Sequence, residues 1–152
     1  MSTRQITEAT FESTIQDNDI VLYDFWADWC GPCKQFAPVF EASSDKHEDV
    51  VFGKIDTEAE QGLAAMLQIT SIPTIMAFRE GVPLLMQPGA LPANALEDLI
   101  TQIKSLDMET VKREYAQQVA AAEAQLAQQP GQPGAAGQSA TPGSGPADIP
   151  SV

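Results

Sequence analysis

The most informative stretch of this sequence reads Asp24-Phe25-Trp26-Ala27-Asp28-Trp29-Cys30-Gly31-Pro32-Cys33-Lys34. Its first part completes residues 20–26, which are β-branched, aromatic or aliphatic apart from Asp24 and are typical of a central strand covered on both faces. From Cys33 to Glu48, apolar residues recur at helical spacing and predict a helix. The stretch therefore predicts a strand, a short loop and a helix, with the two cysteines where the loop meets the helix.

Cys30 is placed by this prediction at a helix N-terminus. Unpaired backbone N–H groups and the positive end of the helix dipole stabilise an anion there, which for Cys30 is a thiolate. Thiolate is the nucleophile of disulfide exchange. Two intervening residues let Cys30 and Cys33 close a ring, so the pair can cycle between dithiol and disulfide. Pro32 fits the first helical turn, and Gly31 leaves room for a substrate backbone.

Two other interpretations of the cysteine pair are a pair of buried core residues and half of a zinc site. A structural zinc site needs four ligands, but the chain has two cysteines and one histidine, His47. Two cysteines also cannot form the multi-bridge framework of a small secreted protein. A Cys-x-x-Cys beside a strand–helix pattern favours redox chemistry. We therefore expect no metal and no bound cofactor.

Strands and helices alternate through the first ~105 residues. Further strands are predicted over 50–55, 74–78 and 82–87, and further helices over 11–15, 58–67 and 92–103. Pro83 favours a sheet edge for the last strand. This alternation predicts an α/β fold, with helices on both faces of a mixed sheet.

The chain closely resembles the thioredoxin family over about residues 6–103. The residues that carry the resemblance are Trp29-Cys30-Gly31-Pro32-Cys33-Lys34, Asp24, Pro38, Ile72-Pro73-Thr74, Gly81 and Gly89-Ala90. The resemblance implies a thioredoxin fold, with a central mixed sheet of four or five strands flanked by about four helices. It also implies reduction of protein disulfides, and reactivation by an NADPH-dependent thioredoxin reductase.

Asp24 is the third catalytic candidate after the two cysteines. A strand covered on both faces would bury it, and burial without a partner raises the pKa of a carboxyl group. In the family this Asp lies beneath the motif and helps to deprotonate the second cysteine through water, which here is Cys33. The alternative is a solvent-facing Asp at a strand edge. Bacterial relatives often place a Lys near this Asp. That position is Phe52 here, and Lys54 has the same strand parity.

The resemblance also implies a substrate-binding surface. In the family the bond before the equivalent of Pro73 is cis and faces the cysteine pair, and the residue before it, here Ile72, can hydrogen-bond an extended substrate through its backbone. Gly89, Ala90 and Trp29 are the other binding candidates. For Trp29, the alternative is a surface aromatic that only packs the loop.

The remaining sequence divides into two parts. Residues 107–129 predict a helix with an apolar stripe that could dock on the domain at 1–106, pair with a second copy, or stay exposed. The stripe consists of Met108, Val111, Tyr115, Val119, Ala122 and Leu126. Residues 130–152 contain five Pro and five Gly and predict a disordered tail.

The net negative charge of the chain limits the classes of molecule that it can bind. The net charge of the chain is −13, of which residues 1–103 carry −11. This acidity argues against nucleic acid and against an anionic membrane surface. The N-terminal residues lack the apolar core of a signal peptide, so we expect the protein to be cytoplasmic. We also expect a monomer. The leading function is a disulfide reductase acting on disulfide-containing proteins. The alternatives are a disulfide oxidase or isomerase, or a binding module whose extension recruits a partner.

Overall fold

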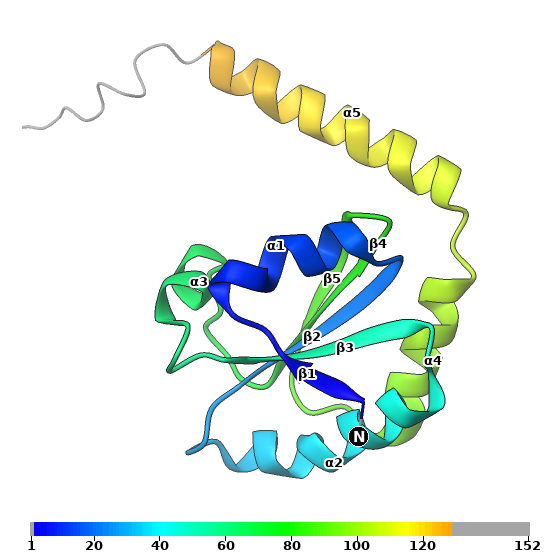
Figure 1. Cartoon of the computed structure of the whole chain (residues 1–152). Coiled ribbons are helices and arrows are strands. Elements are labelled where there is room, and N and C mark those ends of the chain that lie inside the picture. The colour runs from blue at the N-terminus through cyan, green and yellow to red at the C-terminus, as the bar shows by residue number, and fades with distance from the viewer. Residues whose placement is uncertain (1, 129–152) are drawn as a thin grey trace, which may run out of the picture. The chain divides into compact units, whose positions relative to one another are not determined.

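Residues Ile20–Trp26 form β2, the central strand of a five-stranded mixed sheet (Figure 1). The strand order is β1-β3-β2-β4-β5. β1 and β2 pair with β3 in parallel, whereas β4 is antiparallel to β2 and to β5. The other strands are β1 (Thr3–Gln5), β3 (Val50–Asp56), β4 (Thr74–Arg79) and β5 (Val82–Pro88). This computed structural model describes residues 2–128.

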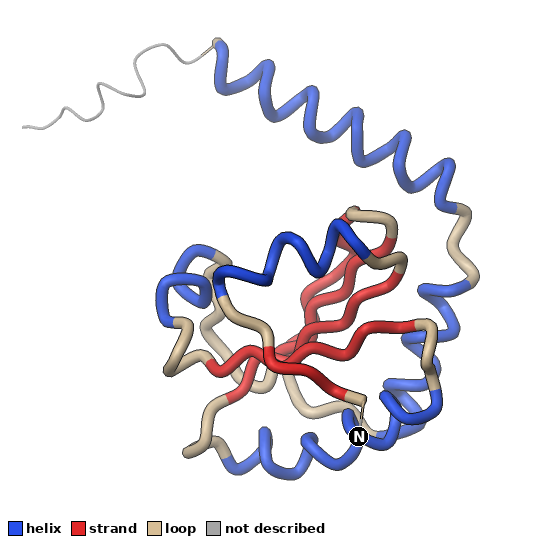
Figure 2. Tube along the Cα trace, viewed as in Figure 1, coloured by secondary structure: helices blue, strands red, loops and turns tan. Residues whose placement is uncertain are grey.

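Four helices cover the two faces of the sheet (Figure 2). They are α1 (Glu8–Asp17), α2 (Gly31–Lys46), α3 (Gln61–Met66) and α4 (Ala93–Lys104). Alternate β2 residues enter two separate cores: Leu22 packs with α2 and α4, and Tyr23 packs with α1 and α3. The mixed five-stranded sheet with helices on both faces confirms the predicted thioredoxin fold. β2 lacks a polar face, and such a strand requires helices on both sides.

One strand was missed, and several predicted helix boundaries differ from the structure. β1 was not predicted, because it has only three residues and none of Thr3, Arg4 and Gln5 is apolar. α1 runs from Glu8 to Asp17 rather than over 11–15. α2 begins at Gly31, two residues earlier than expected, because Cys30 serves as its N-cap. α3 spans Gln61–Met66 rather than 58–67, since Asp56 Oδ1 accepts hydrogen bonds from the backbone N–H groups of Glu58 and Ala59 and forms a turn there.

A further helix, α5 (Met108–Ala127), lies within the range predicted to be helical. The chain separates into two compact units, of which the first is Met1–Met108. α5 is described by itself, so the three alternatives for its apolar stripe remain predictions. The predicted tail at 130–152 lies outside the described residues. Within residues 2–128, no helix combines the length and apolar character needed to cross a membrane.

Candidate active site

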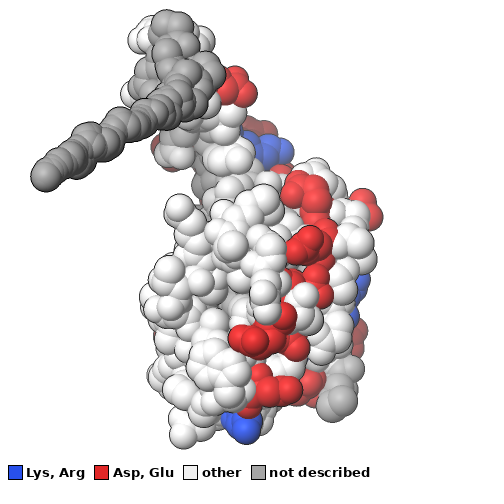
Figure 3. Space-filling view, turned by 90° about the vertical axis from the view of Figure 1, so that its left-hand side faces the viewer, with Lys and Arg blue, Asp and Glu red and all other residues white. Residues whose placement is uncertain are grey.

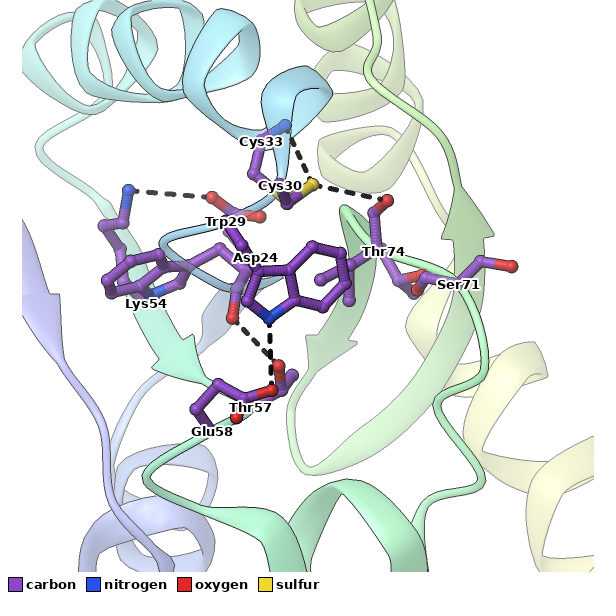
Figure 4. The surroundings of a disulfide bond; sticks show 11 residues. Asp24, Trp29, Cys30, Cys33, Lys54, Thr57, Glu58, Ser71 and Thr74 are labelled. Carbon is purple, nitrogen blue, oxygen red and sulfur yellow. Dashed lines mark hydrogen bonds and ion pairs between the residues drawn. A yellow bond between two sulfur atoms is a disulfide. The ribbon is translucent and has the colours of Figure 1, made fainter.

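Cys30 and Cys33 form a disulfide at the start of α2 (Figure 4). Their Cα atoms are 5.2 Å apart, and both residues are 4% exposed. The Cys33 backbone N–H donates a hydrogen bond of 3.2 Å to Cys30 Sγ, which is the cap of the helix. The same N–H can stabilise a thiolate on Cys30 once the disulfide is reduced. The predicted placement of Cys30 at a helix N-terminus is confirmed.

Two loops meet beside the disulfide. Cys30 Sγ lies 3.7 Å from the carbonyl oxygen of Ile72, and the Ile72–Pro73 peptide bond is cis, as the resemblance implied. The backbone N–H of Gly89 donates to the Pro73 carbonyl at 2.8 Å, which joins the end of β5 to this loop. Gly89 has a φ of +98°, a conformation that favours glycine. Ile72, Pro73 and the Gly89–Ala90 turn therefore lie on one side of the reactive sulfur.

The predicted binding residues differ in exposure. Trp29, Gly31, Pro32, Gly89 and Ala90 are exposed, Ile72 is half-buried, and Pro73 is buried. The Trp29 side chain is 69% exposed, and its Nε1–H donates to Glu58 Oε2 at 3.2 Å. A large apolar surface is thus presented beside the disulfide.

The loop that carries Glu58 is attached to the end of β2. The Thr57 backbone N–H and its hydroxyl both donate to the Trp26 carbonyl, at 2.9 and 3.1 Å. These bonds and the contact between Trp29 and Glu58 fix the β3–α3 loop against the cysteine motif (Figure 4).

Asp24 lies in the interior of the sheet, 1% exposed, which contradicts the alternative of a solvent-facing Asp. Neither carboxylate oxygen has a hydrogen-bond partner in the part of the chain that the structure describes. Burial is the main cause that raises the pKa of Asp24 to about 6, and Lys54 acts in the opposite direction. The Lys54 Nζ is 3.8 Å from Asp24 Oδ2. Asp24 can therefore exchange a proton near neutral pH.

A cavity of about 120 Å³ lies beside Cys33. It is lined by Trp26, Ala27, Asp28, Cys33, Lys34, Ala37 and Lys54. Lys54 thus contacts Asp24 and also borders the cavity that reaches Cys33. The volume is large enough for several water molecules, and its lining includes charged groups that can hold them.

Two further side chains belong to the site, and sequence reasoning anticipated only one of them. Lys54 was considered from strand parity, and the register of β2 with β3 now places it opposite Asp24. Glu58 was not singled out. No motif contained it, and its contact with Trp29 depends on the fold of the β3–α3 loop.

Comparison with known proteins agrees with this geometry. Residues 2–102 match the family model described as Thioredoxin. The chain belongs to the thioredoxin family. It is 52% identical over 121 residues to "Putative thioredoxin 2" of Streptomyces coelicolor, covering 80% of this chain and 90% of the relative. It is 39% identical to a thioredoxin of Porphyra purpurea, covering 67% of this chain and 97% of that one.

Solved thioredoxin structures share the fold. A mutant thioredoxin from Halobacterium salinarum NRC-1 matches with a TM-score of 0.65 at 33% identity, covering 69% of this chain and 93% of that one. Thioredoxins generally act on disulfide substrates and are reduced by thioredoxin reductase. Family and cysteine pair together fit a thiol–disulfide oxidoreductase.

The Lys54 contact yields a testable prediction. Because Lys54 lowers the pKa of Asp24, Lys54→Met should move the Asp24 titration to higher pH, by roughly one pH unit. Carbon-13 NMR of the Asp24 carboxyl group would measure the pH midpoint of this titration. Lys34→Met is the matched control, since Lys34 lines the same cavity without an ion pair to Asp24. Equal titrations in the wild type and Lys54→Met would contradict the assignment.

Proposed function

We infer that this protein reduces protein disulfides by a two-step exchange. The Cys30 thiolate attacks one sulfur of a substrate disulfide, forms a mixed disulfide and displaces the other substrate sulfur as a thiolate. The Cys33 thiolate then attacks Cys30 Sγ and releases the second substrate thiolate. Two electrons pass from the dithiol to the substrate, and the protein is left with the Cys30–Cys33 disulfide.

Asp24 is proposed to take the proton of Cys33 before the second step. A carboxyl group whose pKa is about 6 is ionised at neutral pH and is basic enough to accept a proton transiently. The proton is proposed to pass through water in the cavity beside Cys33. Lys54 stabilises the negative charge of Asp24.

Substrate binding is assigned to the surface around the disulfide. The Ile72 backbone is proposed to pair with an extended substrate segment, with Pro73, Gly89 and Ala90 beside it. Trp29 would cover the apolar part of the segment, while Gly31 and Pro32 leave the approach to Cys30 open, as both are exposed. The proposed location is the cytoplasm, where a dithiol stays reduced.

The observation that carries this proposal is the disulfide at the N-terminus of α2, which lies against the cis-Pro73 loop and beside a buried carboxyl group. A dedicated oxidase or isomerase would use the same cysteines, so the direction of electron flow is the quantity to test. NADPH and a bacterial thioredoxin reductase should support continuous reduction of a disulfide-bonded protein such as insulin. Absence of NADPH oxidation with this protein present would overturn the reductase assignment.

Truncation tests the alternative of a binding module. A chain that ends after residue 106 should keep its turnover in the same assay within about twofold, because every proposed site residue lies before that point. The structural control is a circular dichroism spectrum that retains the signal of the sheet and α1–α4. A tenfold or larger loss of turnover in a folded truncated chain would assign the extension a part in catalysis.

A further inference from the structure

The β3–α3 loop places a negative charge at the edge of the site. Glu58 Oε2 accepts the hydrogen bond from Trp29 Nε1, and the neighbouring Thr57 holds the loop on the end of β2. The Glu58 side chain is exposed, so its charge faces the solvent from which a substrate arrives. Its partner Trp29 directly precedes the attacking cysteine.

A second carboxylate lies near the cysteine pair. Asp28 is exposed and lines the cavity beside Cys33. Of the two lysines in that lining, Lys54 is paired with Asp24, and Lys34 is exposed in the first turn of α2. Asp28, Glu58 and Lys34 together leave a net charge of −1 at the site, within a segment, residues 1–103, that carries −11.

Figure 3 shows the corresponding face, which lies at the left in Figure 1 with α3 and the loop that precedes α2. A row of acidic side chains runs down this face beside a broad area without charged side chains. An uncharged surface with an acidic border favours a segment that carries cations.

We propose that Glu58 determines substrate specificity, selecting disulfides whose flanking residues are Arg or Lys over those flanked by Asp or Glu. The inference rests on the proposed function and adds the substrate class. Glu58 acts in two separable ways: its oxygen orients the Trp29 indole, and its charge attracts a basic segment. Because Glu58 and the basic substrate segment both remain exposed to solvent, the effect of the Glu58 charge is modest and depends on salt.

The test uses pre-reduced protein in single-turnover stopped flow. Three peptides differ only in the residues on either side of one cysteine: Arg, Ser or Glu. The peptide cysteine is joined to 2-thiopyridine, whose release follows attack on the peptide sulfur. We expect the Arg peptide to react about tenfold faster than the Glu peptide at about 0.1 M salt, and within about twofold at about 0.5 M salt, where charges are strongly screened.

Glu58→Gln separates the two effects, because a Gln oxygen still accepts from Trp29 while the charge is lost. We expect the Arg-to-Glu preference to fall to about threefold, with a smaller rate change for the Ser peptide than for either charged peptide. Glu48→Gln is the matched control. Glu48 precedes β3 whereas Glu58 follows it, which separates them by about 20 Å, beyond the ~10 Å Debye length at 0.1 M salt.

Two results would overturn the inference: equal rates for the Arg and Glu peptides in the wild type, or a preference that Glu58→Gln leaves intact. An equal slowing of all three peptides by Glu58→Gln would also overturn it, because it would assign Glu58 only to the position of Trp29. Failure of the wild type to react with the Ser peptide would instead contradict the proposed function.

Discussion

Cys30→Ser should lower the rate of disulfide reduction by at least about 10³-fold. A serine hydroxyl is almost entirely protonated at neutral pH, so the helix N-terminus has no anion to stabilise and no nucleophile forms. Turnover with NADPH and thioredoxin reductase measures the effect. The fold should be retained, because Ser is also a preferred N-cap residue and can accept from the backbone N–H of Cys33.

The size of the loss distinguishes a catalyst from a binding module. If the domain acted only by holding a partner, Cys30→Ser would leave its function unchanged. A variant that kept more than a tenth of the wild-type turnover would contradict the role of Cys30 as nucleophile. Trp29→Phe is a useful comparison, since it keeps an aromatic surface and both cysteines while it removes the contact with Glu58.

Asp24→Asn should stabilise the folded protein at pH 7 by about 3 kcal/mol, because the pKa of Asp24 rises from 3.8 to about 6 on folding. The native state therefore holds more protons than the unfolded chain between about pH 4 and pH 6. The contribution of Asp24 to stability is present below this window and is lost as pH rises through it. Urea unfolding of oxidised protein at pH 4 and pH 7.5 should show a small difference at pH 4 and the full difference at pH 7.5.

The same substitution should slow the reaction while it stabilises the fold. Without the Asp24 carboxylate, release of the mixed disulfide by Cys33 should slow at pH 7, whereas the first attack by Cys30 should change little. Stopped-flow measurement resolves the two steps. Exchange rates that match the wild type from pH 6 to 8 would contradict the role of Asp24 toward Cys33.

The central features of the site could be predicted from the sequence because they are local. Residues 20–26 lack a polar face, which predicts a central strand, and the spacing of Cys30 and Cys33 predicts a ring that begins a helix. Burial of Asp24 follows from the same strand. The cis bond at Pro73 followed only from the family resemblance.

What sequence reasoning missed or left open depends on contacts between distant segments. Strand parity suggested Lys54, but its pairing with Asp24 requires the β2–β3 register, which only the structure gives. The contact of Glu58 with Trp29 joins residues 29 positions apart through the β3–α3 loop. β1 is a strand only because three residues pair with the edge of β3.

Trapping of the covalent intermediate tests the two-step exchange most directly. Reduced Cys33→Ser is mixed with a disulfide-bonded substrate, and the intact mass is measured without reductant. We expect a one-to-one mixed disulfide on Cys30 that dithiothreitol reverses, since no second thiol remains to release it. The reduced Cys30→Ser variant should form little adduct, because the sulfur at the N-cap, which accepts the backbone N–H of Cys33 and is stabilised as a thiolate there, belongs to Cys30. Stable adducts on Cys33 and none on Cys30 would contradict the assigned order of the two cysteines.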